Sequence, residues 1–151
     1  PLFIIILVLA FIIFSYFKFR SPLIITKSTQ EVITKEGGIT QFKVVLHITN
    51  RTNNTIENVS IIDRIPDIAD LEKEGELGVL QPVKLVHSKR GVIAKWIIDS
   101  LGKEEETVIR YKVKSRLSIL GKLPLPTAIG KFKDKKGNAI RSYSNKLDIS
   151  S

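Results

Sequence analysis

The residues of this chain that could do chemistry are scattered and form no familiar reactive grouping. Cysteine is absent from the 151 residues, which excludes disulfides and thiolate metal sites. The two histidines, His47 and His87, have no metal-ligand partner at a useful spacing. The sequence contains no G-x-S-x-G nucleophile motif and no glycine-rich loop that would cradle a phosphate. We therefore expect no enzyme activity, with no catalytic, cofactor-binding or metal-binding residues.

The acidic residue with the most unusual predicted position is Asp63. It lies in register with Val59 and Ile61, so the alternation of a strand places it on the inward side. Because a buried carboxylate must be hydrogen-bonded, we expect Asp63 to accept backbone N–H groups in the turn before Pro66. The acidic segment 67–78 could add carboxylates nearby, but its spacing lacks the pattern of a calcium loop.

Three asparagines begin an N-glycosylation acceptor pattern, N-x-S/T. They are Asn50, Asn53 and Asn58, and all fall within one polar turn region. Asparagine and threonine are also ordinary turn residues, so the pattern has a purely structural explanation as well. Modification of at least one of them requires that this domain faces the outside of the cell.

The chain is strongly basic, with a formal net charge of +9. In the segment 107–114, alternation places Arg110, Lys112 and Lys114 on one side of a strand. This side is a candidate contact for acidic glycans, lipid headgroups or an acidic surface-layer protein, or else a solvated basic face. We expect no nucleic-acid binding, because the aromatic stacking residues of such modules are missing.

Residues 1–17 form a continuous apolar run without a charged residue. As a helix the run would measure roughly 26 Å, close to the hydrocarbon thickness of a bilayer. We therefore predict a transmembrane helix over residues 1–20, with the lipid bilayer as partner. A signal-peptide core would need a small-residue cleavage site. A helix of a soluble domain is less expected, because such helices have a polar side and this run is apolar on every side. Lys18 and Arg20 favour a cytoplasmic position for the domain after the helix, whereas the glycosylation patterns favour an extracellular one.

The rest of the chain reads as short strands separated by turns. The clearest stretch is 41–66, where alternating apolar residues run into a turn rich in Asn and Thr and then resume up to Pro66. We predict an all-β fold over residues 21–151, an Ig-like antiparallel β-sandwich of seven to eight strands. Strands are expected near 23–34, 42–49, 59–66, 79–88, 92–98, 107–114, 127–133 and 139–149, with 117–126 as a linker.

The order of these pieces resembles the DUF11 family of Ig-like repeats in bacterial and archaeal cell-surface proteins. The resemblance is carried by Ile48-Thr49-Asn50, the block from Glu57 to Pro66, and Trp96-Ile97-Ile98 followed by Ser100-Leu101-Gly102. The strand from Thr107 to Val113 and the closing Leu123-Pro124, Asp134, Gly137 and Ser144-Asn145 complete the pattern. The resemblance implies a surface or envelope scaffold domain without catalysis.

We expect a membrane-anchored scaffold or interaction domain of an archaeal cell envelope, single-pass in the cell membrane, with its β domain extracellular. Its partners would be other envelope or surface-layer proteins or acidic glycans. The alternative is a filament subunit of the pilin type, in which the apolar helices of many copies pack together. Because residue 1 is not methionine, the chain is expected to be a processed product or part of a longer protein, whose other parts could carry enzyme chemistry.

Overall fold

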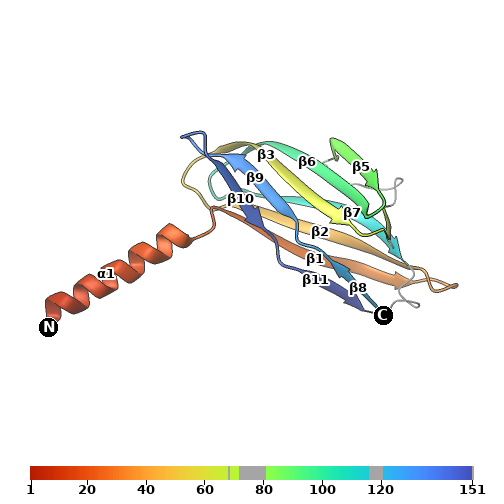
Figure 1. The fold of residues 1–151 in the computed structure, drawn as a ribbon, viewed down its shortest axis with the longest axis horizontal. Helices are drawn as coiled ribbons and strands as arrows, with labels where there is room; N and C mark the ends of the chain where they lie inside the picture. Colours follow the sequence, from red (N-terminus) through yellow and green to blue (C-terminus); the bar gives the residue numbers. More distant parts are fainter. Residues whose placement is uncertain (68, 72–80, 116–120, 151) are drawn as a thin grey trace.

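The computed structural model describes residues 1–67, 69–71, 81–115 and 121–150. The chain begins with one helix, α1 (Leu2–Phe19), which projects away from a body made of strands (Figure 1). Within these described ranges, no helix has both the length and the apolar character needed to cross a membrane.

The side chains of α1 are apolar on all sides and lie in solvent. Its large hydrophobic residues from Leu2 to Phe17 are 52–72% exposed, and its last turn carries Lys18. No side chain caps the first turn, and Arg20 leaves the helix in an extended conformation before Ser21 and Pro22. These helical side chains therefore pack on none of the described strands, and residues 20–22 connect the helix to the body.

The body is a sandwich of two antiparallel sheets, which confirms the predicted all-β fold. One sheet has the order β1-β2-β7-β4 and the other the order β10-β9-β3-β6-β5 (Figure 1). The first comprises β1 (Leu23–Thr34), β2 (Thr40–Asn50), β7 (Glu106–Ser115) and β4 (Ala69–Leu71). The second comprises β10 (Ala139–Tyr143), β9 (Ile129–Lys133), β3 (Ile56–Ile65), β6 (Gly91–Leu101) and β5 (Lys84–Ser88).

The core lies between the two sheets and follows the alternation seen in the sequence. On β2 the side chains of Phe42, Val44, Leu46 and Ile48 are all buried, as predicted. Trp96 on β6 is fully buried and stacks on Tyr111 of β7, with ring centroids 5.6 Å apart. Each of these large aromatic side chains removes a large apolar area from water, so together they join the two sheets.

The strands near the C-terminus are shorter and more numerous than predicted. The segment expected to be a linker contains β8 (Lys122–Leu125), which pairs with β11 (Leu147–Ser150) as a separate ribbon. The ribbon tolerates Pro124 because β8 has only one partner strand and needs no N–H on its other side. The expected single strand 139–149 is broken at Ser144 and Asn145, whose side chains bond Ala128 and Lys27 of β1 instead.

The strand directions give the sandwich two distinct ends. β1 starts directly after the helix, and Leu23 pairs with Asn50 at the end of β2. The turns after β2, β6 and β9 therefore lie at the same end as α1, which we call the helix-side end. The turn between β5 and β6 and the C-terminus lie at the opposite end, the far end (Figure 1).

Candidate functional site

A basic groove lies at the helix-side end of the sandwich. It has a volume of about 1030 Å³ and is lined by residues of the segments 52–60 and 131–139. The first segment is the turn after β2 with the start of β3, and the second is the hairpin formed by β9 and β10. Lys135 joins the two walls, because its Nζ donates to Oδ1 of Asn54 at 2.9 Å.

Four lysines give this groove its charge: Lys131, Lys133, Lys135 and Lys136. Lys131 and Lys133 lie on the outer side of β9, because Phe132 between them points into the core. Among the described residues, none of the four ammonium groups is within ion-pair distance of a carboxylate. The groove therefore keeps its positive charge and can accept an anion.

Two carboxylates also line the groove, Glu57 and Asp134. Oδ1 of Asp134 accepts the backbone N–H groups of Lys136 and Asn138 at 2.9 and 2.8 Å. These hydrogen bonds, that of Asn138 first, lower the pKa of Asp134. The carboxylate of Asp134 thus stabilises the hairpin turn. Four lysines and two acidic residues line the groove, so its net charge is positive.

The three predicted glycosylation residues have different surroundings at this end. Asn50 is fully buried, and its Nδ2 donates to the carbonyl oxygens of Asn54, Leu101 and Gly102 at 2.8–2.9 Å. Its Oδ1 accepts from N and Oγ1 of Thr52 at 2.9 and 2.7 Å. In the folded domain Asn50 therefore has no room for a glycan, and its role is to hold two turns together.

Asn53 and Asn58 are exposed, so the folded chain leaves both sequons open. Asn58 has a φ of 51°, a left-handed conformation that asparagine tolerates better than most residues. This conformation gives Asn58 a structural explanation of its own. Their modification stays a prediction.

The predicted basic face of β7 lies at the surface, but the acidic residue Glu31 lies beside it. Arg110 and Lys114 are exposed and Lys112 is half-buried, and Lys112 is paired with Lys43 on the neighbouring strand β2. Nζ of Lys43 forms an ion pair of 2.7 Å with Glu31, and this contact lowers the pKa of Glu31. A contact role for this face stays a prediction.

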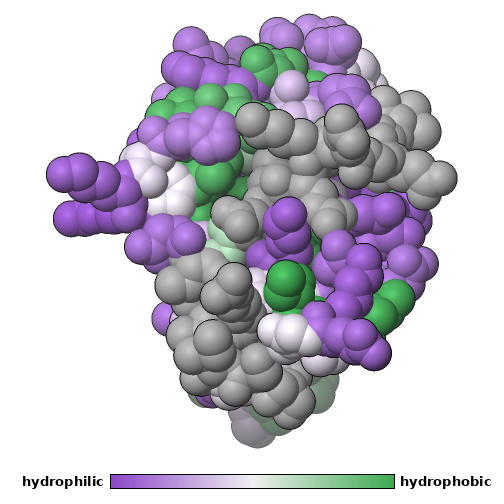
Figure 2. All heavy atoms as spheres, turned by 90° about the vertical axis from the view of Figure 1, so that its right-hand side faces the viewer, coloured by the Kyte–Doolittle hydropathy of each residue, from purple (hydrophilic) through white to green (hydrophobic). Residues whose placement is uncertain are grey.

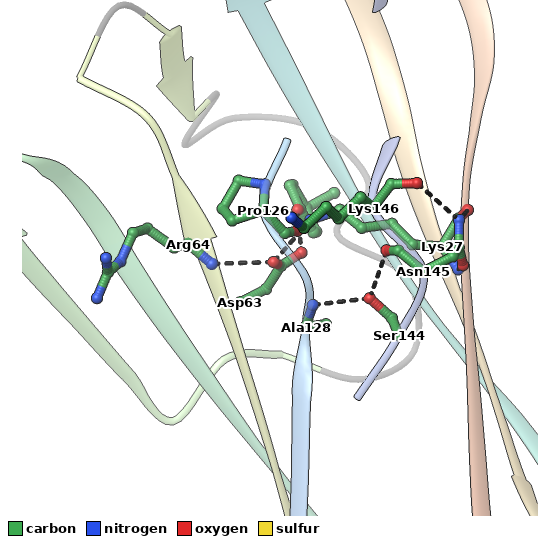
Figure 3. A network of polar contacts seen from close by, with 9 residues as sticks. Lys27, Asp63, Arg64, Pro126, Ala128, Ser144, Asn145 and Lys146 are labelled. Atoms are coloured by element: carbon green, nitrogen blue, oxygen red, sulfur yellow. Dashed lines mark hydrogen bonds and ion pairs between the residues drawn. The ribbon is translucent and has the colours of Figure 1, made fainter. Parts of the chain in front are cut away.

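The predicted inward position of Asp63 is confirmed. Of the expected backbone donors, Arg64 N–H is present, and the other partners are side chains that were not predicted. Oδ1 of Asp63 forms an ion pair of 2.7 Å with Nζ of Lys27, and both side chains are completely inaccessible to solvent (Figure 3). Lys27 also donates to the carbonyl oxygen of Pro126 at 2.8 Å, and Arg64 N–H donates to Asp63. The hydroxyl of Tyr111 donates to the other carboxylate oxygen of Asp63. The pair thus links β1, β3 and β7 inside the core.

Burial raises the pKa of Asp63, and the positive charge and hydrogen bonds of Lys27 oppose this shift. Burial also raises the pKa of Tyr111 well above its usual value, with a further contribution from the charge of Asp63. Although such shifts are common at active sites, no substrate could reach these side chains from solvent. The network is therefore a structural element of the core.

A second set of bonds extends this network to the end of the chain. The side-chain amide of Asn145 bonds both backbone groups of Lys27, accepting from N at 2.8 Å and donating to O at 2.9 Å (Figure 3). Oγ of Ser144 accepts from the N–H of Ala128 at 2.8 Å. These bonds fix the segment between β10 and β11 across the edge of the sandwich.

Sequence reasoning missed Lys27, although the sequence carries a signal for it. Lys27 continues the inward alternation of Leu23 and Ile25, so a strand over 23–34 places its side chain in the core. A lysine at an inward position indicates a buried acid opposite it. Asp63 was the one acid predicted to point inward, so the pairing could have been found.

The histidines and acidic residues form no metal site in the part of the chain that the structure describes. Nδ1 of His47 lies 2.6 Å from Oε1 of Glu106, and both side chains are about half exposed. The predicted acidic segment 67–78 lies partly outside the described residues.

No family model matches this chain, and no curated protein matches it. Solved structures with a similar fold do exist, all with low sequence identity. The major pilin subunit BcpA of Bacillus cereus (D312A variant) has a TM-score of 0.58 and 9% identity, over 85% of this chain and 40% of that one. A non-cellulosomal cohesin from the archaeon Archaeoglobus fulgidus has a TM-score of 0.53 and 16% identity, over 85% of this chain and 89% of that one.

A third similar structure is much larger than this chain. It is a GH20 exo-β-N-acetylglucosaminidase from Vibrio harveyi, with a TM-score of 0.50 and 11% identity over 83% of this chain. This chain spans only 18% of that enzyme and 40% of the pilin subunit. At these identities the similarities establish the fold alone, a β-sandwich also found in cohesin modules and a pilin subunit.

Proposed function

We propose that this protein is a non-catalytic interaction or scaffold domain that its N-terminal helix holds in a lipid bilayer. The observation that carries the proposal is the exposure of α1, whose large apolar side chains are 52–72% exposed on every side. The expected membership of the DUF11 family and an envelope location belong to this same proposal. The fold supports a role in surface interactions, because a cohesin and a pilin subunit are among the proteins that share it.

The free energy of the exposed helix supports burial in an apolar medium. Fourteen large hydrophobic residues of α1 are exposed. At about 1.5–3 kcal/mol for each buried side chain, their transfer out of water is worth on the order of 20–40 kcal/mol. This exceeds the total stability of a typical domain, about 5–15 kcal/mol, so the helix has a strong drive to leave water.

A position within the hydrocarbon of a bilayer suits α1 better than a position flat in the membrane interface. Helices that lie flat in the interface have one polar face, and α1 has none. Tyr16, Lys18 and Arg20 follow the apolar run at its C-terminal end, in the order expected where a chain leaves the hydrocarbon. The sandwich would then stand in water directly beside the membrane.

The sandwich supplies a folded body whose two buried titratable groups with raised pKa values are not accessible to a substrate. Its most perturbed groups, Asp63 and Tyr111, are buried in the core network. Among the described residues the edge strands β10 and β5 each pair with a single strand, which leaves a side on which a partner could dock. We therefore propose binding, without catalysis, as the activity of this part of the chain.

Flotation with vesicles of phosphatidylcholine tests the attachment. We expect the full chain to float with the vesicles, also at high salt. The variant Leu9→Asp/Ile12→Asp should stay at the bottom, because each acid in the middle of a membrane helix costs roughly 2.5–3.5 kcal/mol. The control Val32→Asp/Val86→Asp changes two exposed apolar residues of the sandwich and should still float. If the parent chain does not float, the proposal is wrong.

The alternative function is a filament subunit whose α1 helices pack together. In a filament the exposed apolar side chains of α1 would be buried against those of other copies. One of the proteins with a similar fold is a pilin subunit. Electron microscopy of the purified chain distinguishes the two functions, because only the alternative predicts filaments in the absence of lipid.

A further inference from the structure

The groove described above lies at the end of the sandwich that meets α1. Between the last residue of α1 and the first of β1 there are only residues 20–22. An extended chain reaches about 3.5 Å per residue, so the first residue of β1 lies within about 14 Å of the last residue of α1. This distance is less than two Debye lengths at physiological ionic strength, about 8 Å each.

The far end lies beyond the reach of the same electrostatic field. The long strands β2, β3, β6 and β7 each have 10 or 11 residues, which span roughly 35 Å. That is about four Debye lengths, so charges at the far end are screened from a surface at the helix side. Figure 2 looks onto this far end, where the described residues present mainly hydrophilic side chains with some hydrophobic ones between them.

We propose that the basic groove binds the phosphate headgroups of anionic lipids in the bilayer that holds α1, and so docks the sandwich on the membrane surface. The inference rests on the proposed function. Lys131, Lys133, Lys135 and Lys136 supply the positive charge. Among the described residues none of them forms an ion pair, and they outnumber the two carboxylates that line the groove, Glu57 and Asp134. Lysine is a point-charge donor that suits phosphate oxygens.

Lipid headgroups are favoured over a free polyanion by position. A free partner could use a basic surface anywhere on the sandwich, including the predicted face of β7. Only a partner that lies where α1 leaves the bilayer requires the lysines of the groove to be at the helix-side end. Near the groove, Arg20 and Arg51 add to the positive charge, whereas Glu104 and Glu105 of the turn after β6 oppose it.

The test measures how closely the helix-side end approaches the membrane. The full chain is inserted into vesicles of phosphatidylcholine, or of phosphatidylcholine with phosphatidylglycerol. Because the chain has no cysteine, Thr55→Cys places a single fluorophore in an exposed position at the groove. Quenching by a headgroup-labelled lipid then reports docking.

Two variants with the same change in net charge separate docking from a general effect of charge. Lys135→Gln/Lys136→Gln alters the turn between β9 and β10, and Lys89→Gln/Arg90→Gln alters the exposed turn between β5 and β6 at the far end. Each basic residue near an anionic surface shifts binding by about fivefold. The first variant should therefore lower the docking equilibrium by about 25-fold, and the second by less than about twofold because of screening.

We expect phosphatidylglycerol to increase quenching in the parent chain and high salt to remove this increase. The inference is wrong if phosphatidylglycerol has no effect, or if both variants lose the effect equally. Flotation with phosphatidylcholine alone is independent of the groove, so failure there would refute the proposed function instead. Unchanged Trp96 fluorescence verifies that each variant is folded.

Discussion

Replacing Lys27 with methionine removes the positive partner of a buried carboxylate while nearly preserving volume. In the parent chain Nζ of Lys27 lies 2.7 Å from Asp63, and neither side chain reaches solvent. Loss of one partner of such a pair costs about 3–5 kcal/mol, because the remaining charge has neither solvent nor counter-ion. The domain would lose a large part of a stability that is typically about 5–15 kcal/mol.

The loss of stability should depend on pH, because Asp63 becomes neutral when it takes up a proton. Lys27 opposes the effect of burial on the pKa of Asp63, so the pKa rises further in Lys27→Met. Keeping this acid neutral costs about 1.4 kcal/mol for each pH unit above its unfolded pKa of about 3.9. Relative to the unfolded chain this cost is about 4 kcal/mol at pH 7 and about 1.5 kcal/mol at pH 5. The loss from Lys27→Met is this cost less the smaller cost that the raised pKa of Asp63 already has in the parent chain, and it is larger at pH 7 than at pH 5.

Denaturant unfolding of the full chain in detergent, followed by fluorescence, measures this loss. Trp96 is the only tryptophan, and it stacks on Tyr111, which bonds Asp63. Lys43→Met is the control, because Lys43 has an ion pair of the same 2.7 Å length with the largely exposed Glu31. It should cause little loss at either pH. An equal loss at pH 5 and pH 7, or an equal loss in both variants, would refute the reasoning.

Three further predictions concern single positions. In Gly91→Ala the new Cβ would lie 2.0 Å from the carbonyl oxygen of Ile65, at a φ of +116°, so we expect a loss of about 3 kcal/mol or more in the same unfolding assay. Gly37→Ala, with a φ of +89° and no atom within 4 Å, should lose only about 1–2 kcal/mol, and an equal loss in both would contradict the steric account. Asn50→Ala removes the donor to three carbonyls and should cost about 2–4 kcal/mol. Because the folded pKa of Asp63 is raised, the free energy of unfolding of the parent chain should fall as pH rises from the unfolded to the folded pKa of this group. Asp63→Asn should abolish this pH dependence, and an unchanged pH dependence in the variant would exclude Asp63 as its source.

The long strands could be predicted from the sequence because burial and alternation coincide in them. Phe42, Val44, Leu46 and Ile48 point inward on β2, and the strand breaks at the predicted turn. The broken end of the chain could not be predicted in this way. Ser144 and Asn145 fit a strand by pattern, and only their bonds to Ala128 and Lys27, residues distant in sequence, show why the strand stops.

The candidate site was only partly accessible from the sequence, for a related reason. The basic face of β7 follows from alternation within one strand, and the sequence predicted it. The groove instead combines two turns separated by about half of the chain, which only the pairing of β3 with β9 brings together. Asn50 was singled out for its sequon, but its burial depends on the turn after β6, which the local pattern does not contain.

The depth of Val8 in the membrane tests the central proposal most directly. Val8 lies near the middle of α1 and is 52% exposed, and Val8→Cys would be the only cysteine of the chain. A spin label there, with the full chain in phosphatidylcholine vesicles, is measured against oxygen, which enters the hydrocarbon, and a water-soluble nickel chelate, which does not. We predict ready access for oxygen and almost none for nickel, with the reverse order for a label at Thr55. Ready access of nickel to Val8 in the presence of vesicles would contradict attachment by this helix.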